Sequence, residues 1–116
     1  MNVPAILWEH SMQRFLAARI AEVEYDEKVW APAWDDNNRS MSGPAKKQID
    51  VKMEEMQEVR HLAEDALILT PTNDISNVRW KLAYCRIRYE GFCDFPDDWW
   101  QAIYADLERI AAGGAA

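Results

Sequence analysis

The chain has 116 residues, and its 20 acidic and 13 basic side chains give a net charge of −7. A protein of this length forms a single domain that buries roughly two-thirds of the surface of its unfolded chain. The negative charge disfavours direct nucleic-acid binding, which needs a basic face toward the phosphates. It is typical of an ordinary solvated surface or, less often, of an acidic surface that imitates DNA.

Covalent and membrane-related features are equally limited. The two cysteines, Cys85 and Cys93, are too few for a disulfide framework, and no CxxC pair or Cys/His cluster predicts a metal or redox site. We therefore expect reduced thiols and no cofactor. The N-terminus lacks the basic region and long apolar core of a signal peptide, and no apolar run approaches the roughly 18 residues of a membrane span. These observations predict a cytoplasmic protein without a membrane anchor.

Hydrophobic periodicity predicts an all-α, four-helix bundle-like single domain over residues 1–116, with no strands. The expected helices cover about residues 3–25, 44–69, 73–90 and 96–112, and residues 26–43 are expected to be irregular.

The first predicted helix carries an apolar row at intervals of three and four residues, interrupted by Arg19. The members of the row are Ala5, Trp8, Met12, Phe15, Leu16, Ile20 and Val23. In the irregular segment that follows, Pro32 and a run of Asp and Asn residues break regular structure. Trp30 and Trp34 lie in this segment, and they either fold back onto an end of the core or form a patch that binds a partner.

The second predicted helix places Arg60 among its apolar residues and ends at Thr70-Pro71, because proline disfavours a helical residue before it. Its apolar face consists of Ile49, Met53, Met56, Val59, Ala63, Ala66 and Leu67. Thr72, Asn73 or Asp74 then caps the third helix. The last helix begins after Pro96 with two aspartates and ends at two glycines, Gly113 and Gly114.

The third predicted helix has two opposed apolar faces and is expected to be central, covered on both sides by helices of its own chain or by a second copy. One face holds Ile75, Val78, Leu82, Cys85 and Tyr89, and the other holds Trp80, Ala83, Tyr84 and Ile87. Arg79 and Arg86 lie on one edge between these faces, and Lys81 and Arg88 lie on the other. These basic edges are expected to face the acidic end of the first helix or the turn at Asp97 and Asp98, with a partner protein as the alternative.

Few residue patterns suggest chemistry. Glu58-x-x-His61 resembles a di-iron half-site, but such a site needs a second motif and two further glutamates. Glu55-x-x-Glu58 could hold magnesium only with a second acidic pair, which the third helix lacks. Glu55, Glu58 and His61 are therefore a weak metal-site alternative, and no catalytic set is predicted.

Arginines on apolar helix faces are a second candidate site. Because an unpaired buried charge is costly, Arg19 and Arg60 are expected to pair with a carboxylate such as Glu9, with an anion-binding pocket as the alternative.

The segment around residues 63–82 resembles small helical proteins of alphaproteobacteria and their prophages. The matching positions are Trp8, Asp65-Ala66-Leu67, Thr70-Pro71, Asp74, Trp80-Lys81-Leu82, Trp99 and Leu107-Glu108-Arg109, whereas residues 26–48 depart from the group. The group has no settled activity, so the resemblance implies a bacterial or phage cytoplasm and an accessory role, and no functional residue is carried over.

Together these patterns predict a non-enzymatic protein-interaction module, such as a phage-type regulator or inhibitor of a host defence protein. Its expected contact residues are Trp30, Trp34, Phe92 and Phe95, and its protein partner is unidentified. The alternatives are a metal- or nucleotide-dependent bundle enzyme and a homodimer that shares the second face of the third helix.

Overall fold

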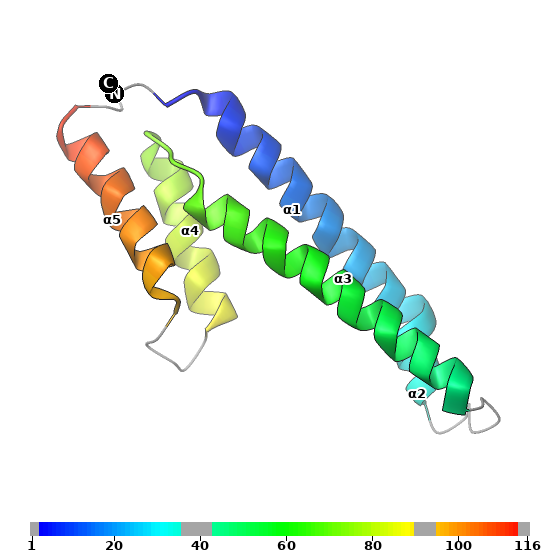
Figure 1. The fold of residues 1–116 in the computed structure, drawn as a ribbon. Helices are drawn as coiled ribbons and strands as arrows, with labels where there is room; N and C mark the ends of the chain where they lie inside the picture. Colours follow the sequence, from blue (N-terminus) through cyan, green and yellow to red (C-terminus); the bar gives the residue numbers. More distant parts are fainter. Residues whose placement is uncertain (1–2, 36–42, 90–94, 114–116) are drawn as a thin grey trace. The chain divides into compact units, whose positions relative to one another are not determined.

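The computed structural model describes residues 3–35, 43–89 and 95–113, which are helical throughout except at turns and ends and contain no strand. The main helices are α1 (Ala5–Tyr25), α3 (Gly43–Leu69), α4 (Ile75–Arg88) and α5 (Asp97–Ala111), shown in Figure 1. The all-α prediction is confirmed. No helix in the part of the chain that the structure describes has the length and apolar character needed to cross a membrane.

The chain divides into two compact units. Unit 1 joins Met1–Met12 to Asp65–Ala116, and unit 2 is Gln13–Glu64. Unit 1 therefore contains the beginning of α1, the end of α3, and the whole of α4 and α5.

Unit 1 is held by an apolar cluster of α3, α4 and α5 side chains. The fully buried members are Ile68, Val78, Cys85, Trp99 and Ile103, and Trp80, Tyr84, Tyr89, Phe95 and Ile110 pack against them. Trp99 is anchored at both ends, since its ring meets Tyr89 edge-on at 5.8 Å and its indole N–H donates to Asp65 at 2.8 Å. The single free thiol of the described residues, Cys85, acts here as a small apolar group.

Local signals place the helix ends of unit 1. The Asp74 carboxylate accepts the backbone N–H of Ser76 at 2.8 Å and so caps α4. At the end of α5, Gly113 adopts a φ of 88°, a left-handed conformation that glycine takes without steric cost. Both ends agree with the sequence-based expectation.

Within the described part of its own chain, α4 is buried most deeply along one side, and cover of its other face by a second copy stays a prediction. Its buried residues are Val78, Lys81 and Cys85, which lie on one side of the helix. On the remaining surface Ile87 is 75% exposed and Ile75 is 48% exposed. The fully buried row of α4 includes a lysine that the helical wheel placed on a charged edge, and the half-buried Trp80 and Tyr84 also pack against the core cluster.

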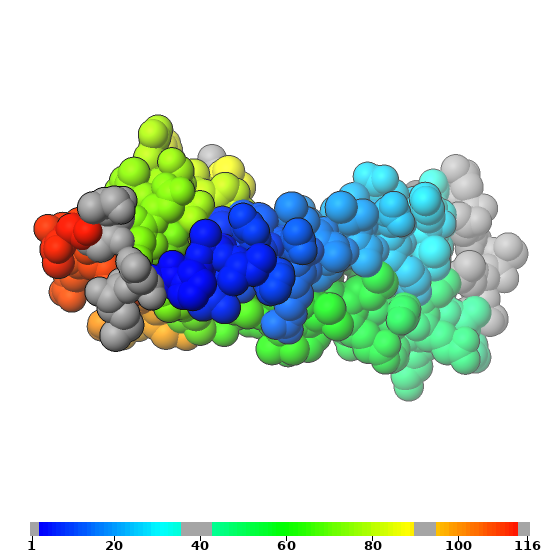
Figure 2. Space-filling model, turned by 90° about the horizontal axis from the view of Figure 1, so that it is seen from above, coloured from blue at the N-terminus to red at the C-terminus, as the bar shows by residue number. Residues whose placement is uncertain are grey.

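Unit 2 is an antiparallel pairing of α1 and α3, whose side-by-side course appears in Figures 1 and 2. Phe15 and Met53 are buried between them, and the Tyr25 hydroxyl donates to the backbone carbonyl of Ile49 at 3.3 Å. The row predicted for α1 is only partly correct, because Leu16 and Ile20 are exposed and Glu22 is buried.

The prediction of an irregular segment over 26–43 is wrong for its first half. A π-helical segment, Asp26–Trp30, continues α1 into a short helix, α2 (Ala31–Trp34), and the backbone becomes extended at Asp35. Pro32 lies in the first turn of α2, where the absence of its N–H is tolerated, and the π-helical segment ends just before this turn. Residues 36–42 lie outside the described residues.

Candidate functional site

The most deeply buried charges of unit 1 are Lys81 on α4 and Asp106 on α5, both 0% exposed. The Lys81 ammonium donates to Asp106 Oδ2 at 2.5 Å and to the backbone carbonyl of Thr70 at 2.7 Å. The ring of Trp8 lies 5.6 Å from the same nitrogen, in a cation–π arrangement. Two hydrogen bonds and one cation–π contact therefore surround the Lys81 ammonium.

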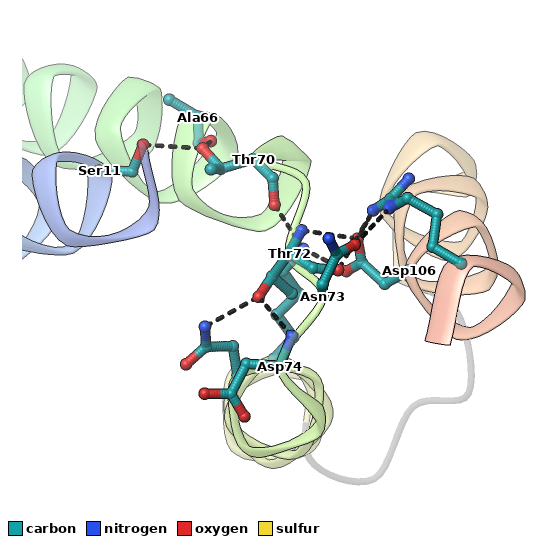
Figure 3. A network of polar contacts seen from close by, with 10 residues as sticks. Ser11, Ala66, Thr70, Thr72, Asn73, Asp74 and Asp106 are labelled. Carbon is teal, nitrogen blue, oxygen red and sulfur yellow. Dashed lines mark hydrogen bonds and ion pairs between the residues drawn. The ribbon is translucent and has the colours of Figure 1, made fainter. Parts of the chain in front are cut away.

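The other oxygen of Asp106 binds the turn between α3 and α4, as Figure 3 shows. Its Oδ1 accepts the backbone N–H of Thr72 at 3.1 Å and a guanidinium N–H of Arg109. Arg109 also donates to the Asn73 side chain at 3.3 Å and to the Thr72 carbonyl at 3.4 Å. One carboxylate thus connects α5 to α4 and to the turn.

The turn itself is fixed by hydroxyl groups. The Thr72 hydroxyl accepts the backbone N–H of Asp74 at 3.1 Å and the side-chain amide of Asn77 at 2.8 Å. The Thr70 and Ser11 hydroxyls are hydrogen-bonded at 2.7 Å, which ties the beginning of α1 to the same turn (Figure 3). We call this set of side chains, centred on Lys81 and Asp106, the buried clamp.

Burial lowers the pKa of Lys81 from its ordinary value of 10.5, because removal from water penalises the ammonium form, and the Asp106 carboxylate opposes this effect. A lysine with a lowered pKa can serve in catalysis. Here, however, the ammonium is fully buried, donates hydrogen bonds to Thr70 and Asp106, and lies over the Trp8 ring. The geometry supports a structural role, in which the clamp sets the position of the α3–α4 turn against α5.

Sequence reasoning missed the clamp, although a signal was present. Val78, Lys81 and Cys85 follow one another at intervals of three and four, so Lys81 lies in the row that the helix buries. Likewise, Asp106 continues the row of Trp99 and Ile103 on α5.

The two tryptophans predicted to bind a partner are brought together in unit 2. The indole N–H groups of Trp30 and Trp34 donate to the same oxygen of Asp50 on α3, at 3.0 and 2.8 Å. Their rings lie 6.3 Å apart, and the Lys46 ammonium lies 4.9 Å from the Trp34 ring. Trp30 is half-buried, but Trp34 remains 50% exposed. We call Trp30, Trp34 and Asp50 the tryptophan clasp.

Of the two predicted phenylalanines, the structure describes Phe95. Phe95 belongs to unit 1, where it stacks on Trp100 at 4.1 Å and packs against the buried cluster. Phe92 lies outside the described residues.

Arg19 and Arg60 both bind Glu22 in unit 2. Arg19 donates to one oxygen of this carboxylate at 2.7 Å, and Arg60 donates to the other at 2.9 Å. Arg60 also contacts Glu64 at 3.4 Å. Two cations and two carboxylates balance in charge, which favours the pairing interpretation with Glu22 in place of Glu9. The anion pocket stays a prediction that these contacts do not support.

The weak metal-site alternative is not assembled. Glu55 pairs with Lys52 at 3.9 Å on an exposed surface, and the His61 ring faces Glu64 at 3.4 Å. Across residues 3–35, 43–89 and 95–113, no three His, Cys, Asp or Glu side chains are placed to hold a metal ion.

Comparison with known proteins gives no further guide: no protein family, no curated protein sequence and no solved structure matches this chain.

Proposed function

We propose that this protein is a non-enzymatic protein-interaction module and that the tryptophan clasp is a contact surface for its partner. The observation that carries the proposal is Trp34, whose side chain is half exposed while its polar atom is already bound within the chain. Tryptophan is enriched among the residues that dominate binding energy at protein interfaces.

The clasp also reduces the cost of binding. Ordering a flexible side chain at an interface costs about 0.5–1.5 kcal/mol. Asp50 holds both indoles in one orientation before any partner arrives, and Trp30 lies beside Trp34. Because the indole N–H groups are satisfied internally, the surface offered to a partner is the apolar part of the Trp34 ring.

The resemblance to small helical proteins of alphaproteobacteria and their prophages supplies the context of the proposal. In that context the module acts in the cytoplasm as an accessory regulator, for example by binding a host defence protein. No contact among the described residues favours the enzymatic alternative.

The test is affinity capture with the tagged full-length chain from a lysate of the cells that produce it. The comparison variants are Trp34→Ala and, as a matched control, Tyr104→Ala, which removes an aromatic side chain that is 56% exposed on α5. We expect the wild type and Tyr104→Ala to capture the same protein and Trp34→Ala to lose it.

A captured protein is then titrated as a purified component. Loss of Trp34 should weaken the complex by about 2 kcal/mol or more, roughly thirtyfold in Kd. Asp50→Asn should weaken it less, because the ring stays present but loses part of its fixed orientation. Equal affinity of the wild type and Trp34→Ala would refute the assignment of this surface.

A further inference from the structure

Helix α4 exposes a row of side chains at the spacing by which one helix packs on another. Ser76, Trp80, Ala83 and Ile87 follow at intervals of four, three and four residues, the alternation found along coiled-coil seams. Ile87 is 75% exposed, and Ser76, Trp80 and Ala83 line, together with Arg79, an open hollow of about 430 Å³. On the helical wheel this row is centred opposite the buried Val78–Cys85 row, and it is exposed at Ser76, Ala83 and Ile87, whereas Trp80 is half-buried and also packs against the core cluster.

The centre of the row is rigid. The Trp80 ring stacks on Tyr84 with centroids 5.1 Å apart and planes at 4°, and it meets the ring of Trp8 edge-on at 5.8 Å. Two aromatic contacts therefore hold the ring in place, so a partner side chain entering the hollow meets a fixed wall.

The charged side chains that α4 itself contributes are all positive. Helix α4 contains Arg79, Lys81, Arg86 and Arg88 and no acidic residue, although the chain as a whole carries −7. Lys81 is neutralised by Asp106, and the Arg88 guanidinium lies over the Tyr89 ring at 5.3 Å.

Arg79 and Arg86 differ from these two residues. Both are exposed, and neither makes an ion pair with any residue that the structure describes. Among the described residues, Asp97 and Asp98 included, these two cations have no ion-pair partner, and both lie along one side of the row.

We propose that this exposed face of α4 docks an acidic amphipathic helix of a partner protein. Apolar side chains of that helix pack along Trp80, Ala83 and Ile87, and its flanking carboxylates pair with Arg79 and Arg86. This surface lies in unit 1, so the proposal is independent of the tryptophan clasp in unit 2.

The charges on this face favour an acidic helix over a second copy of the chain and over a nucleic acid. A second copy packed through the same face would bring Arg79 and Arg86 of both chains along one seam, and like charges there repel. A nucleic acid could pair with the arginines, but its phosphates would leave Ile87 uncovered and would meet a protein of net charge −7. An acidic amphipathic helix matches both the apolar row and the arginines.

The test uses two fluorescent peptides and the full-length protein. One peptide is a designed helix with leucine at the heptad a and d positions and glutamate at e and g; the other has lysine in place of every glutamate. Fluorescence anisotropy should show saturable binding of the glutamate peptide with a Kd in the micromolar range, and at least tenfold weaker binding of the lysine peptide.

Variants of the exposed face decide whether this binding is the proposed one. Ile87→Glu should abolish binding of the glutamate peptide. Ile75→Glu makes the same substitution at an isoleucine 48% exposed elsewhere on α4 and should leave the Kd within twofold. The double variant Arg79→Glu/Arg86→Glu should reverse the preference and bind the lysine peptide at least tenfold more tightly. Circular dichroism verifies that each variant is folded.

Four results would overturn the proposal. They are the absence of saturable binding by the glutamate peptide, equal binding of the two peptides, a concentration-dependent dimer that Ile87→Glu dissociates, and displacement of the bound peptide by a short single-stranded oligonucleotide. The third result assigns the face to a second copy, and the fourth assigns it to nucleic acid.

Discussion

Replacing Asp106 with asparagine tests the buried clamp most directly. The substitution keeps the size of the side chain and leaves an oxygen that can still accept from Thr72 and Arg109, but it removes the negative charge beside Lys81. The Lys81 ammonium is 0% exposed and would then be stabilised only by the Thr70 carbonyl at 2.7 Å and by the ring of Trp8.

The expected loss of stability is large. Removing one partner of a buried ion pair costs about 3–5 kcal/mol, because the remaining charge is left in a medium of low polarity. The Thr70 carbonyl and the Trp8 ring still contact the ammonium, so we expect a value near 3 kcal/mol for Asp106→Asn. In a chain of this size that corresponds to a decrease in Tm of about 10 °C or more.

Urea unfolding followed by circular dichroism measures the effect, with Glu108→Gln as the control on an exposed α5 carboxylate. The control should change the free energy of unfolding by less than about 0.5 kcal/mol. Adding Lys81→Met to Asp106→Asn removes the unpaired ammonium, so the double variant should be more stable than Asp106→Asn alone. Strict additivity of the two single effects would refute the paired, buried arrangement of Lys81 and Asp106.

Three further predictions concern other contacts. The free energy of unfolding of the wild type, relative to that of Lys81→Met, should rise with pH up to about 10.5. In this range the lowered pKa of Lys81 makes the folded state bind fewer protons than the unfolded state. Urea titrations of both proteins from pH 8 upward measure the difference in free energy. Glu22→Gln should lower the free energy of unfolding by about 2–4 kcal/mol, because it removes one of the carboxylates that pair with the Arg60 guanidinium, which is 16% exposed. Glu24→Gln on the exposed side of α1 is the control. Trp99→Phe should cost about 2–4 kcal/mol in thermal unfolding, because it leaves a cavity and removes the hydrogen bond to Asp65, and a loss below 1 kcal/mol would contradict the fully buried position.

The boundaries of the helices were predictable because their signals act over a few residues. Pro71 after α3, the Asp74 cap before α4 and Gly113 after α5 each operate through neighbouring backbone groups. The exception is the stretch around Pro32, where the sequence predicts an end of regular structure. A π-helical segment, which sequence propensity does not reveal, carries the helix past that point.

The candidate contact residues were predicted less completely. Trp30 and Trp34 were identified because two tryptophans in a presumed loop are unusual, and Asp50, which orients both, was not. Asp50 lies 16 and 20 residues away along the chain, so no local pattern connects it to them. Phe95 was grouped with these tryptophans by residue type alone, and the structure places it against the core of unit 1.

The sequence by itself determined the all-α class, the four main helices and their ends, because periodicity and capping are properties of adjacent residues. Only the tertiary structure decided which side of α4 is buried, since the helix has two apolar sides and the wheel could not rank them. It also decided that Lys81 pairs with Asp106, at a separation of 25 residues, and that Arg60 pairs with Glu22, at a separation of 38 residues. Such charges are tolerated in the interior only when folding brings their partners within hydrogen-bonding distance, and that distance depends on how the helices pack.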